Sequence, residues 1–98
     1  MVLEQAVLHV IPGREKEFEV AFAGVVGLLR GASGCRSVRL HRGIETPSRY
    51  LLLVQWDSLE AHVEGFRTSP EYPRYRQPLN PLYESAPEVE HFELSLEG

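Results

Sequence analysis

The sequence has a single cysteine and no long hydrophobic run. Cys35 alone cannot form an internal disulfide, and it excludes a zinc site built from several cysteines. No apolar stretch approaches the roughly 20 residues that a membrane-spanning helix needs. The amino terminus also lacks the basic region and cleavage pattern of a secretory signal. We therefore expect a cytoplasmic protein with no membrane partner.

An excess of basic residues is absent as well. The chain carries 10 Lys and Arg against 14 Asp and Glu, a formal net charge of −4. Nucleic-acid binding needs a basic face that displaces counterions from phosphates, so we expect no nucleic-acid partner. Arg36, Arg39 and Arg42 form a local basic run on a predicted strand. Charges of this kind commonly discourage an edge strand from pairing with other chains.

The composition is otherwise that of an ordinary globular domain, with 43% hydrophobic and 24% charged residues. A chain of 98 residues forms one core that buries roughly 60–70% of the surface exposed on unfolding. No internal repeat or low-complexity segment divides it. We expect a single domain over residues 1–98.

The spacing of apolar residues alternates between the strand and the helix pattern. A helix is predicted from Arg14 to the "GASG" that begins at Gly31, and a second follows Asp57, which can cap it together with Ser58. A Pro- and Tyr-rich segment then contains a short helix that starts at Ser69-Pro70. Strands are predicted over residues 2–11, 35–44, 49–56 and 88–96.

This β-α-β-β-α-β order predicts an α+β fold of ferredoxin-like type, with a four-stranded antiparallel sheet and both helices on one face. The first and third strands are the most apolar, which favours the strand order 4-1-3-2. The third strand, "RYLLLVQW", has aliphatic residues on both faces, whereas an uncovered sheet face is usually polar. We expect the same face of a second copy to cover it, which gives a homodimer.

Several segments together resemble the antibiotic biosynthesis monooxygenase family of dimeric α+β barrels. They are the "PG" turn, "SRYLLLVQWDSLEAH", "FRTSPEY" and "VEHFE", and the resemblance extends from Leu3 to about Glu93. It implies a dimeric α+β barrel with a pocket in each subunit for an aromatic polyketide, a quinol or haem, often without added metal or flavin. We expect no cofactor. We also expect no metal, because His9 and His41 lie on separate strands without ligand spacing.

The resemblance leaves three interpretations of function. An electron-rich phenol or hydroquinone that has lost a proton can itself pass an electron to O2, so a protein that binds it and excludes water suffices. The first interpretation is therefore a cofactor-independent monooxygenase that acts on a small aromatic molecule. The second is a non-catalytic dimeric ligand-binding or scaffold module. Haem degradation is disfavoured, because Ala6 and Arg76 stand where the haem-degrading relatives have an asparagine and a ligand histidine.

His62 is the candidate catalytic base, since the ordinary pKa of histidine, near 6.5, suits that role. Helical spacing places Leu59, Val63 and Phe66 on the inner side of its helix and His62 at the border. A structural histidine that is hydrogen-bonded to a neighbour fits the same position, so both interpretations stay open. Many members of the family have a second histidine later in this helix, where this chain has Gly65 and Phe66.

Other residues are candidates for contact with the substrate. His91 joins His62 if it faces the helices, and it lies in the dimer interface if it faces the other way. Trp56 is either a packing residue or a platform for the substrate. The helical segments supply the remaining candidates, for which an amphipathic surface layer is the alternative interpretation: Phe66, Tyr72, Tyr75 and Arg76.

Overall fold

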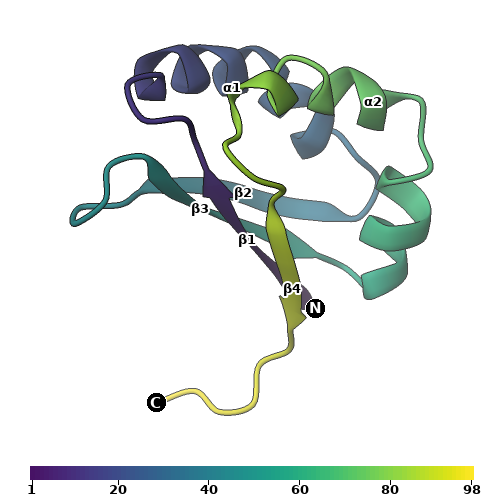
Figure 1. The fold of residues 1–98 in the computed structure, drawn as a ribbon. Coiled ribbons are helices and arrows are strands. Elements are labelled where there is room, and N and C mark those ends of the chain that lie inside the picture. The colour runs from purple at the N-terminus through teal and green to yellow at the C-terminus, as the bar shows by residue number, and fades with distance from the viewer.

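The computed structural model describes residues 1–98 as one antiparallel sheet whose helices all lie on the same face (Figure 1). The helices are α1 (Glu15–Arg30), the π-helix η1 (Ala61–Phe66), α2 (Glu71–Arg76) and the 3-10 helix η2 (Asn80–Leu82). The strands are β1 (Val2–His9), β2 (Cys35–Arg42), β3 (Arg49–Trp56) and β4 (Glu88–Phe92). The α+β, ferredoxin-like fold predicted from the sequence is confirmed.

The strand order β2-β3-β1-β4 is the predicted one, and the two most apolar strands, β1 and β3, are central. Alternate residues of these strands face the helices and form the core with the apolar side of α1. Phe18 of α1 packs on Tyr50 of β3 with ring centroids 4.8 Å apart. No helix combines the length and apolar character that crossing a membrane requires.

The last strand is shorter than predicted. β4 ends at Phe92 and not near Leu96, because Phe92 pairs with Leu3 and β1 begins only one residue earlier, at Val2. A longer β4 would have no neighbour in its own chain. The carboxyl-terminal segment instead turns away from the sheet (Figure 1), with Leu94 and Leu96 exposed.

The segment after β3 also differs from the prediction, because it winds as a π-helix and not as an α-helix. The Arg67 N–H donates to the carbonyl of His62, 3.0 Å away, which is the i to i+5 bond of a π turn. The burial along this segment also differs from the prediction. His62 and Phe66 are buried, whereas Leu59, predicted to face inward, is 43% exposed and Val63 is only half-buried.

Candidate functional site

A cavity of about 450 Å³ lies between the covered face of the sheet and the helices. This volume is within the range of small-molecule sites. The sheet contributes mainly small and aliphatic side chains, such as Ala6, Leu52 and Val89. Polar and aromatic side chains come mostly from the segment between β3 and β4, and Glu4 of β1 joins them: His62, Phe66, Arg67, Tyr72, Tyr75, Arg76 and Tyr83.

A connected group of buried polar side chains lies at one side of this cavity. The indole N–H of Trp56 donates to Oε1 of Glu4 over 3.0 Å. Nε2 of His62 is 3.4 Å from the same oxygen, and its Nδ1 is hydrogen-bonded to Nε2 of His91 at 2.8 Å. The ring of His62 also stacks on Trp56, with centroids 4.9 Å apart. His62 is therefore both part of the cavity wall and fixed in orientation by three neighbours.

The register of the sheet explains how these residues meet. Glu4 pairs with Val54 of β3 on one side and with His91 of β4 on the other. Directly paired residues point to the same face, and Val54 is fully buried under the helices. The sequence allowed His91 to lie on either face of the sheet. In the structure it lies on the face that the helices cover, next to His62.

Glu4 is a site residue that the sequence analysis did not single out. It is only 6% exposed, although it lies in the short run "VLEQAV" near the amino terminus. The period of two in a strand puts Glu4 on the same face as Ala6 and Leu8, which form part of the core. That alternation was the available signal, because a carboxylate on the buried face of a central strand is rare without a function or a partner.

Burial shifts the proton equilibria of this group. Loss of hydration lowers the pKa of His62 to about 4, and the charges of Arg67 and His91 act in the same direction. Loss of hydration also raises the pKa of Glu4, against the opposing effects of the Trp56 hydrogen bond and Arg67. The pKa of His91 is lowered by burial and by Arg67. At neutral pH the His62 ring is thus uncharged and has a lone pair that can accept a proton.

Cationic and aromatic side chains also line the cavity. The guanidinium of Arg76 lies over the Tyr72 ring at 5.2 Å from its centroid. Neither Arg76 nor Arg67 forms an ion pair. Burial raises the pKa of Tyr75 and of Tyr83, so these phenols keep their protons and can donate hydrogen bonds. Such a surface suits a flat ligand that carries a negatively charged oxygen.

The structure thus brings most of the predicted site residues to one place. His62, Phe66, Tyr72, Tyr75 and Arg76 line the cavity. Trp56 has no exposed surface and supports His62 from behind, which matches its packing interpretation. His91 is not among the lining residues and reaches the cavity only through His62. Whether these residues contact a substrate stays a prediction.

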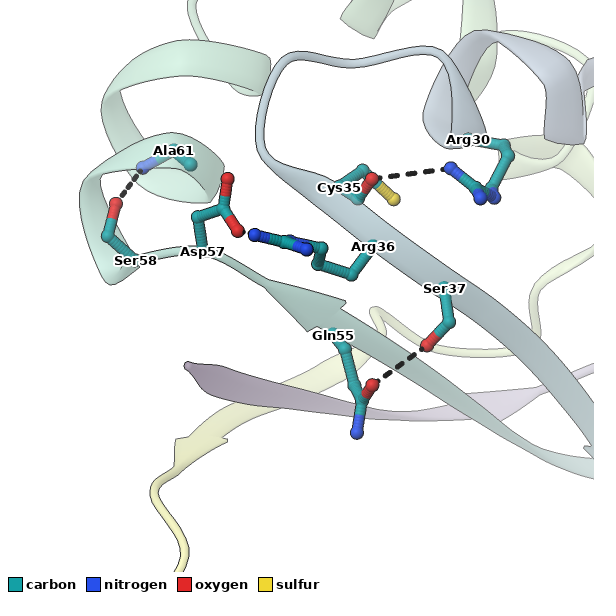
Figure 2. A network of polar contacts seen from close by, with 8 residues as sticks. All are labelled: Arg30, Cys35, Arg36, Ser37, Gln55, Asp57, Ser58 and Ala61. Carbon is teal, nitrogen blue, oxygen red and sulfur yellow. Dashed lines mark hydrogen bonds and ion pairs between the residues drawn. The ribbon is translucent and has the colours of Figure 1, made fainter.

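Polar contacts at the turn between β3 and η1 fix the start of the helix that carries His62 (Figure 2). Asp57, predicted to cap this helix, forms an ion pair with Arg36 of β2, while Oγ of Ser58 accepts the N–H of Ala61 at 3.2 Å. Gly34 lies against the same turn with φ +85°, and a Cβ there would be 2.7 Å from Cβ of Ala61. Glycine at this position permits the close approach that sets the start of η1.

The donor atoms of the site are not arranged around a common point that suits a metal ion. No group of three or more His, Cys, Asp or Glu side chains in the chain is placed to hold one. In the site itself, the facing nitrogens of His62 and His91 are hydrogen-bonded to each other. Ala6 and Arg76 both line the cavity. At the two positions where the resemblance implies haem-binding residues in other members, this chain therefore offers neither an amide nor an axial ligand.

The fold is that of a ferredoxin-like α+β protein with a cavity between the sheet and the helices. The model of the family "Antibiotic biosynthesis monooxygenase" matches residues 1–78. The chain therefore belongs to the antibiotic biosynthesis monooxygenase family, as the sequence predicts.

Related proteins agree with this assignment. The uncharacterized protein YczJ of Bacillus subtilis (strain 168) is 43% identical over 93 residues, which cover 95% of this chain and 98% of YczJ. A crystal structure from Bordetella bronchiseptica, assigned to the antibiotic biosynthesis monooxygenases, is 37% identical with a TM-score of 0.92 and 97% of each chain covered. SnoaB, a cofactor-independent oxygenase from Streptomyces nogalater, shares the fold at 20% identity and a TM-score of 0.84, with 98% and 94% covered.

Proposed function

We propose that this protein is a cofactor-independent monooxygenase that oxidises a small aromatic hydroxy compound with O2. The observation that carries the proposal is the uncharged His62 in the wall of a cavity that is also lined by apolar, aromatic and cationic side chains. The fold is compatible with the reaction, since SnoaB has the same fold and is a cofactor-independent oxygenase.

The cavity supplies what such a reaction needs from a protein. Nδ1 of His62 is hydrogen-bonded to His91, whereas Nε2 forms no hydrogen bond and has Oε1 of Glu4 as a polar neighbour at 3.4 Å, so Nε2 is the nitrogen that can take a proton from the substrate. Arg67 and Arg76 at the cavity favour the anion that results. Once deprotonated, the aromatic ring gives an electron to O2, and the two radicals can combine. For an anthrone the CH2 group becomes C=O, one oxygen atom enters the product and the other leaves as water.

Oxygen uptake tests this proposal. The purified protein, without added metal or flavin, should consume O2 with at least one member of a panel of hydroquinones and hydroxylated anthrones, faster than the compound alone. Binding of the same compounds is measured in parallel by fluorescence quenching. A compound that binds in the cavity while no member of the panel raises O2 uptake above the protein-free rate would favour the alternative, a non-catalytic ligand-binding module.

We further propose that the active form is a homodimer joined through the open face of the sheet. Leu51 and Leu53 of β3 and Val7 of β1 lie on this face, opposite the helices, and are only half-buried. The carboxyl-terminal segment continues the alternation with the exposed side chains of Phe92, Leu94 and Leu96. These apolar groups and the unpaired outer edge of β4 fit a second copy of the chain.

Sedimentation velocity checks the dimer. At micromolar concentration the wild type should sediment at twice the mass of the 11.1 kDa chain. The Leu53→Glu variant should shift toward the monomer, because it places a charge at the centre of the open face. The control is Val20→Glu on α1, where Val20 is exposed on the helix layer, and it should stay dimeric. A wild type that sediments as a monomer would contradict the proposal.

A further inference from the structure

We propose that His91 carries protons between His62 and bulk water, so that the proton removed from the substrate leaves the cavity along the edge strand β4. The substrate in this inference is that of the proposed function, on which the inference rests. The route of the proton follows from the positions of the His62 and His91 rings.

The route follows from which of the buried groups can reach solvent. His62 is 3% exposed and Glu4 is 6% exposed, so neither can pass a proton directly to water. His91 is half-buried on β4, which is an edge strand of the sheet. Its Nε2 lies 2.8 Å from Nδ1 of His62, and the two ring centroids are 5.0 Å apart. The His62–His91 hydrogen bond is thus the one connection from the cavity-lining base to a partly exposed titratable group.

The two rings can move a proton without either ring staying charged. Before the reaction Nδ1–H of His62 donates to Nε2 of His91, and Nε2 of His62, which lies 3.4 Å from Oε1 of Glu4 without a hydrogen bond to it, carries no proton. The substrate proton forms a bond to Nε2 of His62, the proton on Nδ1 passes to Nε2 of His91, and the proton on Nδ1 of His91 goes to water. Each ring ends as its other neutral tautomer, with one proton taken up and one released.

The same path in reverse resets the pair. After the deprotonated substrate and O2 have combined, the peroxide oxygen needs one proton before water can leave. Uptake of a proton at Nδ1 of His91 and its delivery from Nε2 of His62 supplies that proton and restores the first tautomers. Two ionisable groups face the pair, Glu4 from β1, whose pKa burial raises, and Arg67 at the end of η1. The buried, low-pKa His62 gives up its proton readily, which favours transfer over storage.

Chemical rescue tests the relay during turnover. In weakly buffered solution His91→Ala and His91→Gln should each lower turnover by about tenfold or more, since each lacks a group that relays protons near neutral pH. Added imidazole should restore the rate of His91→Ala, where the ring has left space, and should not change the wild type or His91→Gln. The control variant Lys16→Ala removes an exposed side chain of α1, away from the proposed dimer face, and should keep the wild-type rate.

Hydrogen exchange tests the relay without any substrate. In the 15N-labelled protein, the ring N–H of His62 should exchange with deuterated water about tenfold or more slowly in His91→Gln than in the wild type, although glutamine can still hydrogen-bond to Nδ1. If the wild type oxidises no aromatic compound, the proposed function fails while slower exchange still supports the relay. Unchanged exchange in folded His91→Gln would overturn the relay even if turnover falls, because His91 would then act only by positioning His62.

Discussion

Replacement of His62 by glutamine should lower the turnover of the proposed aromatic substrate by about 10²–10⁴-fold, which is the usual contribution of a positioned acid or base. Glutamine can still hydrogen-bond to His91 and approach Glu4, but its amide cannot accept a proton near neutral pH. The change therefore removes the proton acceptor and keeps most of the packing around Trp56 and Phe66.

Alanine is the less informative substitution because His62 is buried and not at a border. The ring has 3% of its surface exposed and stacks on Trp56 at 4.9 Å. His62→Ala would leave a cavity and an unpaired nitrogen on His91, which together cost roughly 2–4 kcal/mol of stability. A loss of activity in this variant could then come from partial unfolding.

The variant His62→Gln is compared with the wild type by steady-state O2 uptake. Its melting temperature and its sedimentation show whether it is folded and dimeric. The control is Lys16→Gln, which introduces the same amide at an exposed position of α1, away from the proposed dimer face, and it should retain the wild-type rate. A folded His62→Gln protein that oxidises the substrate as fast as the wild type would show that His62 is structural, which is the other interpretation that the sequence allows.

The fold could be predicted because strand and helix periodicity are strong here. β3 has the predicted bounds, Arg49–Trp56, since its ends are marked by the "TPS" break and by the capping residues Asp57 and Ser58. The strand order followed from which strands could tolerate charge at an edge. The end of β4 could not be predicted in this way, because it depends on where its partner β1 begins.

The site was predicted less completely, for two physical reasons. The rotation of η1 depends on its π winding, and ideal α-helical spacing therefore put His62 at a border when it faces inward. The partners of His62 come from β1 and β4, which are far from it in sequence, so only the register could bring Glu4 and His91 to the same face. The aromatic residues of the cavity were easier to predict, because their segment must cover the sheet.

The opposed pKa shifts of Glu4 and His62 predict a distinct pH dependence of stability for each variant. The pKa of His62 falls from 6.5 in the unfolded chain to about 4 in the fold, so its contribution to stability is present above pH 6.5 and is lost as the pH falls toward 4. Burial raises the pKa of Glu4 above its ordinary 4.5. Its contribution is therefore present below pH 4.5 and is lost as the pH rises through the folded value. In the wild type the two effects offset each other in part.

Replacing either His62 or Glu4 should leave only the pH dependence of stability that the other residue contributes. Relative to the wild type, His62→Gln should gain roughly 3 kcal/mol in its free energy of unfolding as the pH falls from about 7 to about 4, because it no longer contains a buried ring that must be protonated. Glu4→Gln should show the opposite trend and become relatively more stable as the pH rises, because its amide still accepts the Trp56 N–H and never ionises. Urea unfolding at a series of pH values measures both difference curves, with Lys16→Gln, a change at an exposed position of α1, as the control. Parallel curves for the two variants would mean that Glu4 and His62 form a charged pair in the folded protein, and the neutral base assigned to His62 would then be wrong.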